Sequence, residues 1–166
     1  MADLRSAPPG TLQKFYIYVK NRIVVTLHTI HVGDGRRVVT LDFNESDEAS
    51  AFLDKLEKSN KDGFAMLRSR IEAVAARDRY ENQLTFKHVG NDIFEFKRPG
   101  LRLYAFYDSL PGLQPQLIIA TNGGTKNTAK EQQRDIARAI NLKTRYEQAK
   151  SAPSTAIKLI ILPHEN

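Results

Sequence analysis

Three strand-like segments separated by short turns lie in the middle of the chain, and they limit its possible folds more than any other feature. The segments are Leu84 to Lys97, which breaks at Gly90-Asn91, then Leu101 to Asp108, and Gln114 to Thr121. β-branched and aromatic residues are frequent in them, as is typical of β-strands. Because the connecting turns are short, we expect neighbouring segments to pair as an antiparallel meander.

Further strands and helices flank this meander on both sides. Before it we expect strands at Lys14 to Val19, Arg22 to Val32 and Arg36 to Phe43, and two helices that begin near Asp47 and Phe64. A polar break separates the two helices, which therefore look like a helical hairpin. After the meander, Thr128 and Glu131 have the spacing of a capping box, which predicts a helix from about Ala129. A last strand is expected at Ile157 to Pro163.

This order of elements predicts one α+β domain, and a length of 166 residues suits that organisation. The chain contains no cysteine, which excludes disulfide bonds, a thiol nucleophile and thiolate metal sites. No apolar run approaches the ~20 residues that span a bilayer, and the first residues lack the apolar core of a signal peptide. We therefore expect a soluble protein of the cytoplasm.

Positive charge is concentrated in one half of the chain. The formal net charge is +6. Residues 1–63 carry nine basic and nine acidic side chains, whereas residues 84–150 carry eleven basic and six acidic ones. A basic half attached to a neutral half is typical of a surface that binds a polyanion such as nucleic acid. The same excess is also compatible with a role in solubility alone.

A segment with two glycines and a lysine joins the last meander strand to the following helix. Gly123 and Gly124 allow backbone N–H groups to approach a ligand, and the helix start adds unpaired N–H donors. Lys126 and Lys130 add full positive charges. Together these features predict a phosphate-binding loop, although the Walker A motif is absent. The alternative interpretation is a plain strand-to-helix turn with exposed lysines.

Cations and one histidine follow the meander strands. Lys97 and Arg102 flank the Pro99-Gly100 turn, so they are candidates for cross-strand neighbours, and Lys87 lies on the preceding arm. His88, beside Lys87, belongs to the residue type that titrates near neutral pH and is a candidate general base. The alternative interpretation places these residues on the solvated face of a sheet whose other face is apolar.

His28 and His31 are the candidates for a metal pair. Three residues apart in a strand, they are expected to point to opposite faces of the sheet. No nearby carboxylate or cysteine completes a set of ligands. We therefore expect no metal and no other cofactor.

The run from Phe86 to Gln148 resembles the HigB-like, phage-derived branch of the RelE/ParE toxin superfamily. Lys87 falls at the first lysine of the family pattern, and "FEFK" falls at its Glu-apolar-Arg pattern, with Lys97 in place of the arginine. "LRLYAFY" supplies Arg102, "GGTKNTAKE" supplies the lysines of the loop, and "DIARA" matches the helix. The resemblance covers roughly Arg37 to Lys150.

The resemblance implies a RelE-like α+β fold, an antiparallel twisted sheet with an N-terminal helical hairpin and a C-terminal helix, plus extra terminal strands. In this interpretation residues 1–166 form a single domain with a core at about 37–150. The additional strands lie at about 14–32 and 157–163. We expect the terminal segments to pair or pack at the edge of the core, where they cover an exposed strand.

The resemblance also implies an activity, that of a toxin which cleaves mRNA in the ribosome without a metal. The RNA 2′-OH attacks the adjacent phosphate and leaves a 2′,3′-cyclic phosphate. The family assigns this chemistry to cations that orient the nucleotide and offset the phosphorane charge. Carried onto this chain, the catalytic residues are Arg102 and Lys97 at the phosphate and Lys87 for substrate positioning or proton transfer. The substrate-binding residues are Lys126 and Lys130 on the RNA backbone or rRNA, with Tyr104 or His88 as alternative proton carriers.

Two other functions are compatible with the same resemblance. ParE-like members of the superfamily inhibit DNA gyrase by binding and cleave no RNA. A non-catalytic RNA-binding or regulatory module would keep a salt-dependent affinity for RNA without arresting growth. The toxin interpretation also implies a cognate antitoxin protein as partner, beside mRNA and the ribosome.

Overall fold

The structure is a computed structural model, and it describes residues 24–125 and 127–165. Seven strands and three α-helices lie in these residues. The strands are β1 (Val24–Val32), β2 (Arg36–Phe43), β3 (Phe86–Gly90), β4 (Ile93–Arg98), β5 (Leu101–Asp108), β6 (Gln116–Thr125) and β7 (Ala156–Ile160). The helices are α2 (Glu48–Ser59), α3 (Lys61–Ala75) and α4 (Ala129–Ser151), and a short 3-10 turn, η2 (Pro163–Glu165), follows β7.

All seven strands join one mixed sheet in the order β3-β4-β5-β6-β2-β1-β7. The meander is confirmed, because β3 to β6 pair in succession as antiparallel neighbours. The predicted RelE-like antiparallel sheet is wrong. A RelE sheet has three or four strands, whereas this sheet has seven, and it contains two parallel pairs, β2 with β6 and β1 with β7. The chain remains α+β, with a larger and mixed sheet.

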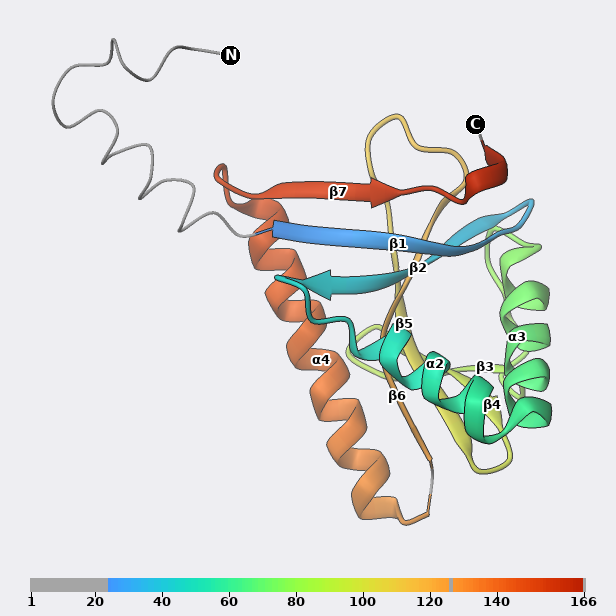
Figure 1. The fold of residues 1–166 in the computed structure, drawn as a ribbon. Coiled ribbons are helices and arrows are strands. Elements are labelled where there is room, and N and C mark those ends of the chain that lie inside the picture. The colour runs from blue at the N-terminus through green and yellow to red at the C-terminus, as the bar shows by residue number, and fades with distance from the viewer. Residues whose placement is uncertain (1–23, 126, 166) are drawn as a thin grey trace, which may run out of the picture.

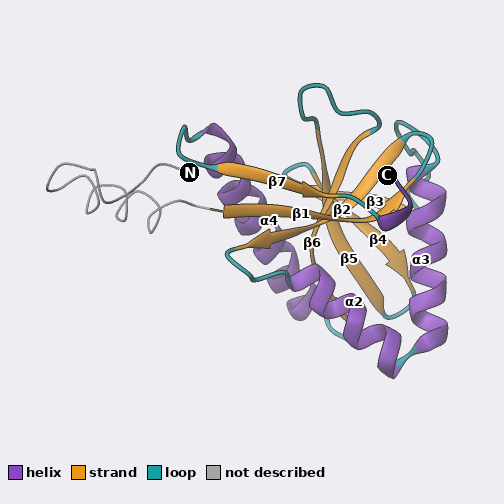
Figure 2. Cartoon of the chain, turned by 45° about the horizontal axis from the view of Figure 1, so that its top comes forward, coloured by secondary structure: helices purple, strands orange, loops and turns teal. Residues whose placement is uncertain are grey.

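Helices cover both faces of the sheet. In Figure 1, α4 lies to one side of the strands and α3 to the other, with α2 beside α3, and Figure 2 shows the same layers from a tilted view. Two hydrophobic cores fill the spaces between the layers. One joins the sheet to α2 and α3, and the other joins it to α4.

Alternate side chains of the central strands belong to different hydrophobic cores. On β4, Phe94 and Phe96 belong to the core under α2 and α3, whereas Ile93 belongs to the core under α4. On β5, Leu103 faces the first core and Phe106 the second. Successive residues of a strand point to opposite faces. Both faces of the middle of these strands are therefore buried, so Glu95 and Arg102 lie inside the protein.

Local sequence signals set the helix starts. Thr128 is the N-cap of α4, and its hydroxyl accepts a hydrogen bond from the Glu131 backbone N–H, as predicted. The first helix was expected to begin near Asp47, and Asp47 is the N-cap of α2, where its carboxylate accepts from the Ser50 N–H. The segment Leu84 to Lys97 forms two arms, β3 and β4. The predicted strand at Lys14 to Val19 lies outside the described residues.

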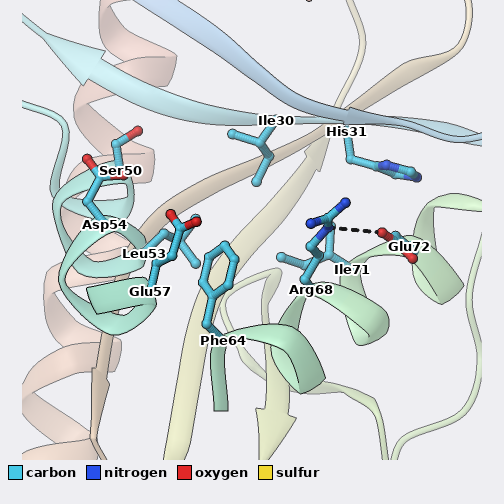
Figure 3. A pocket seen from close by; sticks show the side chains of 10 residues that line it. All are labelled: Ile30, His31, Ser50, Leu53, Asp54, Glu57, Phe64, Arg68, Ile71 and Glu72. Carbon is cyan, nitrogen blue, oxygen red and sulfur yellow. Dashed lines mark hydrogen bonds and ion pairs between the residues drawn. The ribbon is translucent and has the colours of Figure 1, made fainter. Parts of the chain in front are cut away.

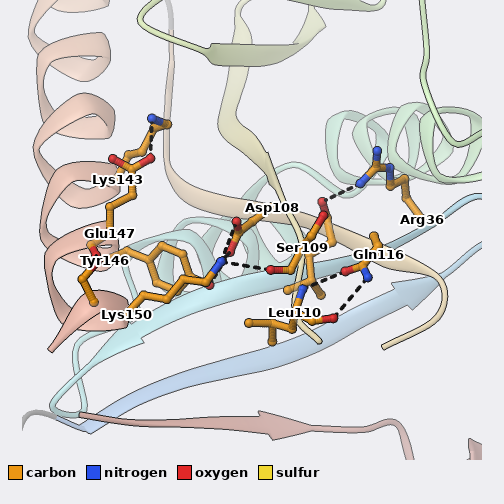
Figure 4. A network of polar contacts seen from close by, with 11 residues as sticks. Arg36, Asp108, Ser109, Leu110, Gln116, Lys143, Tyr146, Glu147 and Lys150 are labelled. Carbon is orange, nitrogen blue, oxygen red and sulfur yellow. Dashed lines mark hydrogen bonds and ion pairs between the residues drawn. The ribbon is translucent and has the colours of Figure 1, made fainter. Parts of the chain in front are cut away.

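A polar network fastens the C-terminal half of α4 to the end of β5 (Figure 4). Tyr146 donates from its hydroxyl to Asp108 Oδ2 at 2.6 Å, and Lys150 Nζ lies 3.0 Å from both carboxylate oxygens of Asp108. Burial, followed by the hydrogen bond to Asp108, raises the pKa of the Tyr146 hydroxyl. Tyr146 thus remains a protonated donor at neutral pH, and it anchors the helix.

The two terminal strands extend the sheet beyond β2. β1 pairs with β2, and β7 pairs with β1 at the edge of the sheet. η2 then places Glu165 beside Arg37 of β2. Arg37 donates from Nη2 to Glu165 Oε1 at 2.6 Å and from Nη1 to Oε2 at 3.0 Å. The side chains are only 8% and 16% exposed, so this bidentate ion pair ties the last residues to the sheet.

Replacing Glu165 by glutamine should remove a pH-dependent part of the stability. The hydrogen bond from Arg37 lowers the pKa of Glu165 below its ordinary 4.5. A lowered pKa stabilises the fold above the unfolded value, and this stabilisation is lost as pH falls through the folded value. We expect Glu165→Gln to reduce the free energy of unfolding by about 1–3 kcal/mol at pH 7, and by progressively less below pH 4.5.

Urea unfolding at several pH values measures this difference. Glu147→Gln is the matched control, because Glu147 is 54% exposed and its pair with Lys143 lies within one helix, where such pairs contribute about 0.3–0.5 kcal/mol. A Glu165→Gln effect that stays constant from pH 7 to pH 3 would contradict the ionic origin.

Candidate functional site

A buried ion pair lies between the two central meander strands, on the face covered by α4. Glu95 of β4 is 1% exposed and Arg102 of β5 is 6% exposed, and Arg102 Nε lies 3.3 Å from Glu95 Oε2. Their neighbours on β4, Phe94 and Phe96, point into the opposite core. Strand alternation therefore directs the Glu95 carboxylate toward α4.

The ion pair also binds the turn after β4 and the start of α4. Arg102 Nη1 donates to the carbonyls of Arg98 and Leu101 at 2.6 and 2.7 Å. Gln132, in the first turns of α4, donates from Nε2 to Glu95 Oε2 at 3.2 Å. A buried charge without a partner is strongly destabilising. Arg102 and Glu95 hence hold each other, the β4–β5 turn and the helix in one arrangement.

Two further ionisable groups border this pair. Tyr104 is fully buried, and its hydroxyl has no hydrogen-bond partner among the described residues. Burial, followed by the charges of Glu95 and Asp135, raises the pKa of Tyr104, and Arg102 offsets only part of this effect. Burial also raises the pKa of Asp135 on α4. This interior disfavours additional negative charge, so Tyr104 stays a neutral phenol at pH 7.

Gly123 and Gly124 do not form the predicted phosphate-binding loop. Both lie within β6, which continues past its expected end at Thr121 to Thr125. A β-carbon on Gly123 would meet the ring of Phe52 on α2, and one on Gly124 would meet the carboxylate of Asp135 on α4. The glycines therefore let the helices on both faces approach the strand closely, and they lie in neither a phosphate-binding loop nor the turn of the alternative interpretation.

Three of the predicted lysines lie on the elements that hold the buried pair, two on its neighbouring strands and one at the start of α4. Lys87 is the cross-strand partner of Glu95, and Lys97 is the partner of Arg102. Paired residues of antiparallel strands share a face, so both lysines lie on the α4 side. Lys130 is exposed in the first turn of α4, close in sequence to Gln132. We call Lys87, Lys97 and Lys130 the basic face.

The structure separates the other predicted residues from this face. His88 follows Lys87 on β3 and therefore points to the opposite side of the sheet, where its ring lies 5.1 Å from that of Phe94. Tyr104 is on the α4 side but has no exposed surface, so it cannot contact a substrate in this conformation. Lys126 lies outside the described residues.

A groove of about 310 Å³ lies elsewhere, between α2, α3 and β1 (Figure 3). Apolar side chains, including Phe64 and Ile71, line it, and Asp54 and Glu57 of α2 border it. Arg68 pairs with Glu72 at 3.2 Å on α3. The groove contains none of the cations predicted from the sequence, and its carboxylates make it unsuitable for a polyanion.

The two histidines of β1, the candidates for a metal pair, lie in different surroundings. His28 Nε2 lies 3.0 Å from Asp42 Oδ2, and His31 lines the groove in Figure 3. The expected alternation between them is interrupted by a register shift between Thr29 and His31. In the described part of the chain, no group of three or more His, Asp or Glu side chains is arranged to hold a metal ion.

Comparisons with known proteins identify no relative. No protein-family model, no curated protein and no solved structure matches the chain. The membership in the RelE/ParE superfamily therefore stays a prediction based on the sequence motifs. None of the helices within residues 24–125 and 127–165 is both long and apolar enough to cross a membrane.

Sequence reasoning placed Arg102 in the site but missed its partner Glu95. It also missed Gln132, which donates to Glu95, and Asp135, whose charge raises the pKa of Tyr104. A signal for Glu95 was present in the sequence, because it stands between two phenylalanines in a strand where both faces are apolar. A charged residue in such a strand requires a buried partner of opposite charge. Gln132 and Asp135 carried no comparable signal, since an amphipathic helix normally exposes such residues.

Arg102→Met should destabilise the protein strongly, because it leaves the Glu95 carboxylate buried without a counter-charge. We expect a loss of about 3–5 kcal/mol in the free energy of unfolding. The double variant Glu95→Gln, Arg102→Met should recover part of this loss, since no unpaired charge then remains. A double-mutant cycle by urea unfolding measures the coupling.

Lys97→Met serves as the control, because this neighbour has no ion pair with a described residue; it should change stability by less than about 1 kcal/mol. Losses that simply add in the double variant would mean that Glu95 and Arg102 are energetically independent.

Proposed function

We propose that this protein is the toxin of a toxin–antitoxin system and that it cleaves mRNA on the ribosome without a metal. The observation that carries the proposal is the basic face, in which Lys87 and Lys97 are cross-strand partners of the buried Glu95–Arg102 pair and Lys130 lies in the first turn of α4. Lysines on one face bind a polyanion through its phosphates. The motif resemblance to HigB-like toxins is the second support, and it points to mRNA as the polyanion.

The proposed cleavage uses the RNA's own nucleophile. The 2′-oxygen forms a bond to the adjacent phosphorus while the bond from phosphorus to O5′ breaks. The 2′-OH proton passes to a base, a proton reaches O5′, and the products are a 2′,3′-cyclic phosphate and a 5′-hydroxyl. We assign Lys97 to the phosphate charge and Lys87 to substrate positioning or proton transfer, because both are accessible beside the pair.

Arg102 receives a different role from the one expected from the sequence. It is almost fully buried and binds Glu95 and two backbone carbonyls. We therefore propose Arg102 as a positioning residue that keeps the strand bearing Lys97 in register with β5. This burial also favours a second candidate function, a non-cleaving RNA-binding module, because it leaves the basic face without an exposed guanidinium.

The proposed partners follow from the proposed activity. Translating ribosomes place the protein in the cytoplasm, and mRNA and rRNA phosphates are the ligands of the basic face. A cognate antitoxin would restrain the toxin, and acidic side chains that cover Lys87, Lys97 and Lys130 would do so directly.

Expression in a bacterial host tests the activity. We expect growth arrest and new in-frame mRNA 5′ ends within minutes, and we expect both to vanish for Lys87→Gln, Lys97→Gln. This variant avoids the folding defect of an Arg102 replacement. Lys55→Gln, Lys58→Gln is the matched control, with the same charge change on exposed residues of α2.

Three results would contradict the nuclease proposal in different ways. Growth arrest without mRNA cleavage would favour a gyrase-type or other binding toxin. Normal growth with soluble protein and retained RNA affinity would favour the non-cleaving module. Cleavage that persists in the Lys87, Lys97 variant would place the active site elsewhere.

RNA binding itself should depend steeply on salt. For single-stranded RNA, each phosphate contact contributes about 0.7 to the slope of log affinity against log salt concentration. Replacing Lys87, Lys97 and Lys130 by glutamine should therefore reduce the slope by about 2. Fluorescence anisotropy of a labelled oligonucleotide at several salt concentrations measures it. An unchanged slope would exclude the basic face as the RNA contact.

A further inference from the structure

A notch lies at the start of β4, beyond which the neighbouring strand β5 continues. The β4–β5 pairing ends at Phe94 opposite Ala105, whereas β5 continues to Asp108 beside β6. A cavity of about 230 Å³ occupies this position. It is lined by residues of four elements or their adjoining loops: Arg79, Asp92, Phe94, Tyr107, Lys143 and Glu147.

Aromatic rings and a guanidinium provide flat surfaces in the notch. The rings of Phe94 and Tyr107 meet edge to face, with centroids 5.1 Å apart. The exposed Arg79 lies with Cζ 5.0 Å from the Tyr107 centroid and 5.8 Å from that of Phe94. Aromatic rings and arginine planes are the surfaces on which proteins stack unpaired nucleobases. Arg79 forms no ion pair with a described residue, so it is available to such a ligand.

The charges of the notch suit a base better than a phosphate. Arg79 and Lys143 are balanced by Asp92 and Glu147, and Lys143 Nζ lies 2.7 Å from Glu147 Oε1 on α4 (Figure 4). A phosphate would meet two carboxylates at close range. A neutral base with an exocyclic amino group would instead donate hydrogen bonds to them, as cytosine N4 does to aspartate or glutamate.

From this geometry we propose that the notch binds one unpaired, amino-bearing nucleobase of an RNA strand. Phe86 stacks on Phe94, and Arg36 lies over the Tyr107 ring. The base therefore stacks on the exposed plane of Arg79, and Asp92 or Glu147 accepts from its amino group. This inference rests on the proposed function, because it takes the RNA held by the basic face as the source of the base. Lys143 and Glu147 of α4 also line the notch, so it reaches the side of the sheet on which Lys87 and Lys97 lie, and one RNA strand along that side can contact both the notch and these lysines.

The notch can be tested by comparing oligocytidine with oligouridine of equal length. The two bases have the same ring size, but only cytosine carries an amino group that a carboxylate can accept from. We expect the protein to bind labelled oligocytidine about five-fold more tightly in fluorescence anisotropy. The variant Asp92→Asn, Glu147→Gln should bind both equally. Asparagine tolerates the left-handed backbone at position 92, where φ is 58°.

Arg79→Gln tests stacking separately from the carboxylates. It should weaken binding of both oligonucleotides by several-fold while leaving the cytidine preference in place, because guanidinium stacking is tolerant of base identity. Thermal unfolding of each variant shows whether the fold is intact. The surface control Arg77→Gln changes the same charge on the same loop and should leave both affinities unchanged.

Failure of the notch and failure of the proposed function give different results. RNA binding that depends on Lys87, Lys97 and Lys130 but shows no cytidine preference would overturn the notch alone. A cytidine preference that survives Asp92→Asn, Glu147→Gln would also overturn it. Absence of any measurable RNA binding by the folded protein would overturn the proposed function together with the notch.

Discussion

The buried pair of Glu95 and Arg102 is the interaction on which the arrangement of the basic face depends. It joins β4 to β5, receives Gln132 from α4, and holds the β4–β5 turn through two carbonyls. Removing either charge would leave the other buried and unpaired, which is far more costly than losing an exposed ion pair. The positions of the surface lysines follow from this interior arrangement, because Lys87 and Lys97 are cross-strand partners of the two paired residues.

Different contacts fasten the two ends of α4 to the sheet. At the start of the helix, Gln132 donates to Glu95, and Gly124 permits the close approach of Asp135 to β6. At its end, Tyr146 and Lys150 bind Asp108. Between these two anchors, apolar side chains fill the core under the helix. A helix held at both ends keeps Lys130 at a defined place beside the sheet.

Elements of the fold and the antiparallel meander could be predicted from the sequence, but the parallel pairings that complete the sheet could not. Capping at Thr128 and the strand pattern at Leu101–Asp108 are local signals, and the structure agrees with both. The parallel pairing of β2 with β6 joins segments far apart in the chain, and no local pattern encodes that register. Arg102 was expected to contact a phosphate, or alternatively to lie on a solvated face, because charge in a strand usually indicates exposure. Here helices cover both faces, so the charge is internal and paired.

The contrast between the basic face and the notch suggests how the two would divide the recognition of RNA. Lysine is a flexible point charge and needs no fixed geometry to attract a phosphate, so the basic face would supply affinity and salt dependence without base preference. The rings of Phe94 and Tyr107 are held by packing against Phe86, which gives the notch a fixed shape. A fixed shape with placed carboxylates is what base discrimination requires. The preference for one base would therefore come from the notch at the start of β4, and the general attraction for RNA from the basic face.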